Sequence, residues 1–205
     1  MTTPTTARDI SAYRQPEYDV DRLFVQRWSP RAMSGEAMED AALMGLFEAA
    51  KWAPSSYNNQ PWRFLYAKRQ TSHWPVFFDL LITGNQNWAK NAAVLIVIVS
   101  KNTLDRDGSP APTHSFDAGA AWENLALQAT MRGFVAHGMQ GFDYDKARRV
   151  LQVPAGYTVE AMVALGKPGK PEDLPERLRA REVPSGRKTL AEIVFEGGFP
   201  PQERV

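Results

Sequence analysis

The sequence predicts an α+β domain in which helices cover both faces of one sheet. Two segments carry this prediction. Residues 94–99 are an unbroken run of Val, Leu and Ile, which is typical of a strand buried on both faces. Residues 117–132 are rich in alanine and leucine, which favours a long helix. Weaker helix and strand patterns alternate around these two segments. This alternation predicts one sheet that lies between two layers of helices.

The first fifty residues predict an arm followed by a helix. Residues 1–20 are polar and aperiodic, so we expect a flexible N-terminal arm and assign residues 21–205 to a single domain. A helix is expected from Ser34, because serine is a favourable N-cap and the apolar residues after it recur at helical spacing. Pro54 ends this helix, since proline has no backbone N–H to donate.

The middle of the chain predicts short elements on either side of the buried strand. Residues 103–113 contain an Asp-Gly pair and two prolines, which indicates a surface loop. The elements expected before this loop are a strand at 64–67, a helix at 73–82 that Gly84 ends, and a helical turn or loop at 87–92.

The last third of the chain predicts further alternation. Gly133 is expected to form the C-cap of the helix at 117–132, and Asp143 the N-cap of a helix that runs to Leu151. The other expected elements are a strand at 134–136, a strand at 157–165, an irregular basic segment at 167–189 and a last strand at 193–195.

Composition excludes several classes of function. The 205 residues carry a formal net charge of +1, so no strong field points to nucleic acid or an anionic membrane as the main partner. The chain contains no cysteine, which excludes disulfide scaffolds, thiolate metal sites and thiol catalysis. The polar N-terminus does not resemble a signal peptide, and the apolar run at 92–99 is too short to cross a bilayer. We therefore expect a cytoplasmic protein.

The sequence offers no catalytic side chain and no metal site. The three histidines, at positions 73, 114 and 137, do not have the spacing of metal ligands, and a structural or exposed role is expected for each. The chain has neither a G-x-S-x-G elbow nor a phosphate-binding P-loop. Residues 138–141 contain two glycines without the spacing of a dinucleotide fingerprint.

The run at residues 53–64, Ala-Pro-Ser-Ser-Tyr-Asn-Asn-Gln-Pro-Trp-Arg-Phe, is the most informative segment. Its proline, serines and asparagines cannot continue a helix, because they lack a donor or compete for backbone hydrogen bonds. The loop they form is dense in hydroxyl and carboxamide groups, which suits a polar ligand. An ordinary connection between a helix and a strand is the alternative interpretation.

Cationic residues elsewhere suit a bound organic cofactor. Arg27 and Arg31 lie four residues apart with Ser29 between them, and Arg187 lies in the late basic segment. Guanidinium groups match the oxygens of a phosphate monoester. Asn87 and Lys90 lie within one helical turn, and an ammonium beside a redox heterocycle stabilises the negative charge that develops on reduction. For any one of these side chains, a solvated surface position is the alternative.

Five segments together resemble the nitroreductase family of flavoenzymes. They occur in the family's order between about residue 22 and residue 197, and they are 27–31, 53–64, 87–90, 117–125 and 140–143. The resemblance implies a mixed sheet flanked by helices on both faces. It also implies a homodimer with two FMN sites at the subunit interface. The C-terminal segment would cross to the partner, where residues 192–195 would add an edge strand.

The resemblance assigns the phosphate and the pyrimidine edge of FMN to particular residues. Arg27 and Arg187 would contact the phosphate, with Ser29 close by and Trp28 contributing through its backbone. Arg181 is the alternative to Arg187. The residues implied at the polar pyrimidine edge are Arg31, Asn87 and Lys90.

The remaining implied cofactor-binding residues come from both subunits. Met139, Gln140 and Gly141 would lie along the flavin, with a backbone N–H directed at N5. The partner's copy of the polar loop would supply Pro54, Ser55, Ser56, Asn58 and Gln60.

The activity that the resemblance implies is hydride transfer. NADH or NADPH would reduce FMN, and a nitroaromatic, quinone or enone would then take the electrons in a ping-pong reaction. Two alternatives remain at this stage. One is a relative with flavin-fragmenting or reductive dehalogenase chemistry, and the other is a non-catalytic flavin-binding protein.

Overall fold

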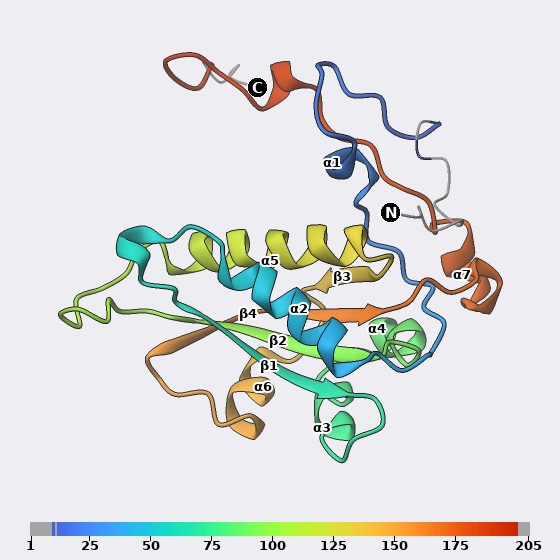
Figure 1. Cartoon of the computed structure of the whole chain (residues 1–205), viewed down its shortest axis with the longest axis horizontal. Coiled ribbons are helices and arrows are strands. Elements are labelled where there is room, and N and C mark those ends of the chain that lie inside the picture. The colour runs from blue at the N-terminus through green and yellow to red at the C-terminus, as the bar shows by residue number, and fades with distance from the viewer. Residues whose placement is uncertain (1–9, 11, 201–205) are drawn as a thin grey trace, which may run out of the picture.

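The computed structural model describes residue 10 and residues 12–200, and it contains one central sheet (Figure 1). The strands are β1 (Trp62–Lys68), β2 (Val94–Lys101), β3 (Val135–Met139) and β4 (Tyr157–Gly166), in the order β1-β2-β4-β3. The expected α+β fold is confirmed. All three strand pairs in the described residues are antiparallel, so the mixed sheet that we expected would require a further strand, parallel to its neighbour.

Helices cover both faces of the sheet (Figure 1). One face carries α2 (Asp40–Lys51) and α5 (His114–Met131), and the other carries α3 (Trp74–Phe78), α4 (Thr83–Ala89) and α6 (Tyr144–Val150). Successive side chains of β2 enter opposite cores, as Ile96 packs with the α2–α5 side and Val97 with the α3–α4 side. The unbroken apolar run at 94–99 is thus explained, because this strand is buried on both faces.

The remaining elements are short. α1 (Arg22–Gln26) and α7 (Glu176–Arg179) are helices of one turn. The 3₁₀ turns are η1 (Ser56–Asn58), η2 (Pro171–Asp173) and η3 (Leu190–Glu192).

The prediction that a helix begins at Ser34 is wrong. Helix α2 begins at Asp40, with Glu39 as its N-cap. The backbone before it is held elsewhere, since Met33 forms an antiparallel bridge with Pro168 and the Ser34 N–H donates to the Lys167 carbonyl at 3.1 Å. This pairing with the far end of the chain overrides the local N-cap signal.

The helix predicted at 73–82 is also wrong in extent. α3 ends at Phe78, and Gly84 lies inside α4 rather than ending a helix. A bridge between Leu81 and Phe142 and a hydrogen bond from the Ile82 N–H to the Gly141 carbonyl divide the two helices. Gly84 is tolerated because it lies in the first turn of α4, where backbone N–H groups have no partner within the helix.

Helix ends were predicted better in the second half of the chain. The Asp143 side chain caps α6 by accepting the Lys146 N–H at 2.8 Å, as expected. Gly133 follows α5 with a φ of +74°, which is the left-handed conformation that favours glycine after a helix. The start of α5 is His114, three residues before the predicted Asp117.

The last predicted strand, at 193–195, is wrong for the single chain. The segment follows η3 without pairing to any strand of the described residues, and the Ile193 and Val194 side chains are exposed. Because a strand requires a neighbouring strand edge, this apolar segment does not become one in isolation.

The two ends of the chain run side by side beyond the helices (Figure 1). The Arg14 Nε donates to the Ser185 carbonyl at 2.9 Å, and the Leu190 N–H donates to Glu17 Oε1 at 2.9 Å. Residues 1–9 and 11 of the expected N-terminal arm lie outside the described residues. Within the described part of the chain, no helix combines the length and the apolar character needed to span a membrane.

Candidate functional site

The segment that carries Arg27 and Arg31 is attached to the sheet through His137. The His137 Nδ1 lies 3.1 Å from the Pro30 carbonyl, and because a carbonyl only accepts, this nitrogen carries the proton. The His137 ring packs on Trp88 of α4 with ring centroids 4.7 Å apart. His137 therefore joins the arginine segment, strand β3 and helix α4 at one place.

His137 stays neutral at physiological pH. Its pKa is lowered from 6.5 to about 4, chiefly by burial and also by the nearby Arg31 and Arg27 cations, against hydrogen bonds to the Pro30 and Ser29 backbone that raise it. The structural role expected for this histidine from the sequence agrees with its position.

The backbone at Arg31 is held by Glu182, which sequence reasoning missed. This carboxylate is buried, and its Oε1 accepts the Arg31 N–H at 2.6 Å and the Ala32 N–H at 2.7 Å. The Arg31 Nη1 lies 4.0 Å from Oε2. Glu182 is the only acidic residue between Glu176 and Glu192, but nothing local in the sequence indicates a partner about 150 positions away.

Three guanidinium groups gather where the two ends of the chain meet. Arg14 donates to the Arg27 carbonyl at 2.6 Å and to the Ser185 carbonyl at 2.9 Å. The pKa of Arg14 is lowered, first by burial and then by the charges of Arg187 and Arg27. The Arg27 Nη1 also lies 3.4 Å from the Ser29 hydroxyl. This convergence of cations suits a phosphate group, and it favours Arg187 over Arg181 as the late arginine of the site.

The end of β3 and helix α4 bring the next predicted residues together. Asn87 lies on α4, and Lys90 is the exposed C-cap of that helix. The Gly141 carbonyl accepts the Asn85 Nδ2 at 3.0 Å, which places residues 139–141 beside α4. A Cβ at Gly141 would lie 2.7 Å from the Asn85 Nδ2, so a larger residue there would have to displace the Asn85 side chain. In this stretch Met139 is buried, whereas Gln140 is exposed.

The polar loop at 53–64 has an unusual backbone. Tyr57, Asn58 and Gln60 have φ values of 52°, 52° and 47°, in the left-handed region that residues other than glycine rarely occupy. The loop is fastened by the Ser56 N–H, which donates to the buried Asp117 carboxylate at 3.1 Å, and by the Ser55 hydroxyl, which accepts the Gln60 N–H at 3.0 Å. Such strain persists only where surrounding contacts fix it, and it is common at ligand sites.

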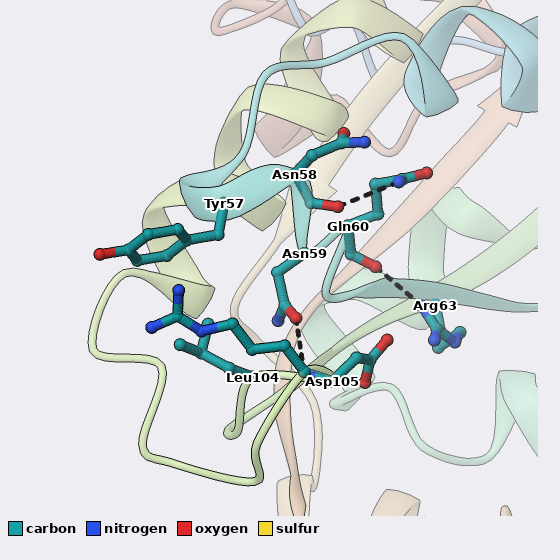
Figure 2. A pocket seen from close by; sticks show the side chains of 8 residues that line it. Tyr57, Asn58, Asn59, Gln60, Arg63, Leu104 and Asp105 are labelled. Atoms are coloured by element: carbon teal, nitrogen blue, oxygen red, sulfur yellow. Dashed lines mark hydrogen bonds between the residues drawn. The ribbon is translucent and has the colours of Figure 1, made fainter.

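A cavity of about 360 Å³ lies between this loop and the loop that follows β2 (Figure 2). The Arg106 guanidinium lies 4.0 Å from the centroid of the Tyr57 ring. The Asn59 carboxamide crosses the two loops by accepting the Asp105 N–H at 2.8 Å. The volume is within the range of small-molecule sites. Its lining is polar and comprises Tyr57, Asn58, Asn59, Gln60, Arg63, Leu104, Asp105 and Arg106.

The predicted residues thus fall into two groups. The arginine group is Arg27, Trp28, Ser29, Arg31, Asn87, Lys90, Met139, Gln140, Gly141 and Arg187. The loop group is Pro54, Ser55, Ser56, Asn58 and Gln60. The loop group immediately precedes Trp62 at the start of β1, and α4 lies beside the other end of that strand, where Lys68 pairs with Val94 (Figure 1). A strand of this length spans about 20 Å, so within one chain the loop group lies far from Asn87 and Lys90 at α4.

A cluster of Ser100, His114 and Glu160 resembles a hydrolase site only in composition. The Ser100 hydroxyl is fully buried and donates to the Glu160 carboxylate, and the His114 Nδ1 lies 2.7 Å from the same hydroxyl. A serine that already donates to a carboxylate has no proton to give to histidine, so His114 is the donor in this pair. In the described residues there is no group of three or more His, Cys, Asp or Glu side chains that could hold a metal ion.

Known proteins share both the sequence pattern and the fold. The Nitroreductase family profile matches residues 24–167. Protein DrgA of Synechocystis sp. is 30% identical over 178 residues, which cover 69% of this chain and 80% of DrgA. The crystal structure of an oxidoreductase containing FMN shares 49% identity and has a TM-score of 0.88, covering 92% of this chain and 97% of that one.

A second solved structure extends this likeness. A candidate nitroreductase from Desulfovibrio desulfuricans, in complex with FMN, shares 28% identity and has a TM-score of 0.69, covering 90% of this chain and 100% of that one. The match of the family profile spans most of the domain, from the Arg27 segment to the end of β4. The chain belongs to the nitroreductase family.

Proposed function

We propose that the protein is an FMN-dependent oxidoreductase that takes electrons from NADH or NADPH and passes them to nitroaromatic, quinone or enone acceptors. The FMN-containing structure at 49% identity supports this cofactor. The observation that carries the proposal is that Arg14 bonds both the Arg27 carbonyl and the Ser185 carbonyl, two residues before Arg187, and so brings the two arginine segments together. We also propose a cytoplasmic location, where the nicotinamide donors are found, and a single domain over residues 21–205.

The arginine group fits FMN at its charged end. Burial, and then the charges of Arg187 and Arg27, lower the pKa of Arg14. The three neighbouring guanidinium groups give the site an excess of positive charge that a phosphate dianion would neutralise. Ser29 would add a hydroxyl donor, since it lies 3.4 Å from the Arg27 guanidinium. Trp28 would contribute through its backbone.

Arg31, Asn87 and Lys90 suit the polar edge of the cofactor. Bound FMN would supply hydride and electron transfer, which no amino acid side chain provides. Arg31 is held in place by the buried Glu182, and Lys90 presents an exposed ammonium at the end of α4. Cations at that edge would stabilise the negative charge of the reduced state. Met139, Gln140 and Gly141 would lie along the ring.

Binding and positioning are the tasks that fall to the protein. The Ser100–His114–Glu160 cluster is not arranged as a nucleophile with its base, and we assign no side chain to proton transfer. Donor and acceptor would use the same pocket in turn, which gives ping-pong kinetics.

We further propose that each site is built from two chains. The loop group lies at the start of β1, whereas α4, which carries Asn87 of the arginine group, lies beside the other end of that strand. Pro54, Ser55, Ser56, Asn58 and Gln60 would therefore serve the cofactor of the partner subunit. Residues 192–195 would pair with the sheet of the partner, supplying the strand that makes the sheet mixed.

Anaerobic reduction of the purified protein tests this function. The protein is expected to be yellow, to contain FMN and to be bleached by NADH or NADPH, and adding a quinone or a nitroaromatic compound should restore the colour. A protein that binds no FMN would refute the proposal. Stable FMN that neither nicotinamide reduces would indicate a flavin-binding protein instead. Release of dimethylbenzimidazole under oxygen would indicate flavin fragmentation, and halide release from a halogenated acceptor would indicate dehalogenation.

A further inference from the structure

We propose that Arg14, from the N-terminal segment, is a positioning residue that assembles the phosphate site and makes the protein select FMN over riboflavin. This inference rests on the proposed function. Arg14 precedes the part of the chain that the family profile matches, which begins at residue 24. It is therefore an addition to the site from outside that region.

Arg14 is bonded to both segments that carry the phosphate-binding arginines. Its Nη1 donates to the Val25 carbonyl at 2.8 Å and to the Arg27 carbonyl at 2.6 Å, and its Nε donates to the Ser185 carbonyl at 2.9 Å. Ser185 is two residues from Arg187, whose Nη1 bonds the Ser185 hydroxyl at 3.2 Å. One guanidinium thus fixes the backbone at Arg27 relative to the backbone at Arg187.

This fastening is needed because the two segments are distant in sequence. Residues 25–27 form the end of α1 and its C-cap, whereas residues 185–187 follow α7 in a stretch without regular secondary structure. Arg27 and Arg187 carry like charges that repel each other. Glu182 and the Leu190 N–H anchor the late segment on either side of residues 185–187, and Arg14 bonds the stretch between them directly. The planar fork of arginine is suited to this task, because two of its nitrogens reach different carbonyls at once.

The local electrostatics agree with a site built for an anion. Besides burial, the charges of Arg187 and Arg27 lower the pKa of Arg14. The Arg27 Nε lies 3.5 Å from Glu123 Oε1, but this carboxylate is half exposed and compensates only one of the three cations. A phosphate carrying −1.5 to −2 charges would compensate the rest. Riboflavin has no phosphate and would gain nothing from this arrangement.

Dissociation constants for FMN and for riboflavin test the inference. They are measured by flavin fluorescence for the wild-type protein and for the variants Arg14→Gln, Arg14→Lys and Arg149→Gln. Arg149 is an exposed residue of α6, so its substitution removes the same charge from the opposite face of the sheet. Amide hydrogen exchange of residues 183–188 in the FMN-free protein measures how firmly Arg14 holds this segment when no flavin is bound.

The Arg14→Gln variant is expected to bind FMN about 10- to 100-fold more weakly, as for the loss of hydrogen bonds from a charged group. Its affinity for riboflavin should change less than twofold. Arg14→Lys keeps the charge but cannot reach the three carbonyls from two nitrogens, so its affinity for FMN should be closer to that of Arg14→Gln than to the wild type. Residues 183–188 should exchange faster in both variants, and Arg149→Gln should behave as the wild type.

Three results would overturn the inference. Equal weakening of FMN and riboflavin would mean that Arg14 supports the fold rather than the phosphate site. Wild-type affinity in Arg14→Lys would mean that charge alone suffices. Unchanged affinity for FMN in Arg14→Gln would remove Arg14 from the site. If the wild-type protein itself binds no FMN, the proposed function fails instead, and the exchange measurement still decides whether Arg14 fastens the two segments.

Discussion

At the scale of single residues, His137 links pH to stability. It is neutral in the folded protein with a pKa of about 4, whereas its ordinary value is 6.5. Between pH 6.5 and pH 4 the unfolded state binds a proton that the folded state does not. The free energy of unfolding therefore falls as the pH falls through this window, and the stability is fully present above pH 6.5.

The variant His137→Gln tests this linkage. Glutamine can still donate to the Pro30 carbonyl but does not titrate. The free energy of unfolding is measured with urea at pH 7 and at pH 4.5. Its decrease between these pH values should be roughly 2 kcal/mol larger for the wild-type protein than for the variant. If both proteins lose the same stability between these pH values, His137 is not the titrating group.

Glu182 is expected to be the most costly side chain of the site to remove. In Glu182→Ala the partly buried N–H of Arg31 and the buried N–H of Ala32 lose their acceptor, and the free energy of unfolding should fall by about 2–5 kcal/mol. Glu182→Gln keeps an acceptor oxygen and should lose less than half of that amount. Equal losses in the two variants would show that the negative charge, rather than hydrogen-bond acceptance, holds Arg31.

The sequence indicated candidates for ligand-binding residues, but not the residues that hold those candidates in place. Arg27, Arg31 and Arg187 stand in local patterns that chemistry can interpret. Glu182 and Arg14 act through partners about 150 and 171 positions away, and one sequence shows no such pairing. Sequence patterns therefore named the arginines of the site but not how they are fixed.

At the scale of elements, Asp117 couples the polar loop to helix α5. Its buried carboxylate accepts the Ser56 N–H at 3.1 Å and lies 3.4 Å from the Thr113 hydroxyl. In Asp117→Ala, hydrogen exchange at Ser56 should become about 10-fold faster or more, as expected for the loss of a bond to a charged acceptor. Asp117→Asn keeps an acceptor and serves as the control. Slow exchange at Ser56 in the alanine variant would show that the loop is held by other contacts.

Gly141 determines how closely β3 approaches α4. In Gly141→Ala the new Cβ would lie 2.7 Å from the Asn85 Nδ2 and 2.8 Å from the Ile82 Cδ1, so the free energy of unfolding should fall by about 1–3 kcal/mol. Gly45→Ala is the control, because no atom lies within 4 Å of a Cβ there and the substitution in α2 should raise stability by up to about 1 kcal/mol. A Gly141→Ala variant as stable as the wild type would mean that Ile82 and Asn85 move aside freely.

Element prediction succeeded where one local signal dominated. The buried strand at 94–99 and the Asp143 cap needed only composition and spacing. Predictions failed where tertiary pairing overrode the local signal, as at Ser34, whose backbone pairs with Lys167. The strand predicted at 193–195 also depends on tertiary pairing, and in the described residues this segment pairs with no other strand.

At the scale of the whole molecule, exposed apolar side chains mark surfaces that a single chain leaves uncovered. On α5, 80% of Phe116 and 63% of Met131 are exposed, and in the C-terminal segment 63% of Val194 is exposed. Large exposed apolar side chains are candidates for burial in a protein interface. The separation of the loop group from the arginine group gives a second, independent reason to expect two chains in each site.

The oligomeric state and the variant Val194→Asp test this expectation together. Light scattering should give the wild-type protein twice the chain mass of 22.9 kDa. Because Val194 is exposed in the single chain, an aspartate there should leave the stability of one chain nearly unchanged. A weaker dimer would then mean that position 194 is buried in the interface, because an unpaired charge is costly to bury.

Val150→Asp is the matched control, because Val150 is an exposed valine at the end of α6 on the opposite face of the sheet. The dimer of Val194→Asp should dissociate at a protein concentration at least 10-fold higher than that of Val150→Asp. Its FMN affinity should fall in parallel, because in the proposed two-chain site the loop group comes from the partner. A monomeric wild-type protein that binds FMN tightly would contradict the two-chain site. A Val194→Asp variant that dimerises like the control would place the C-terminal segment outside the interface.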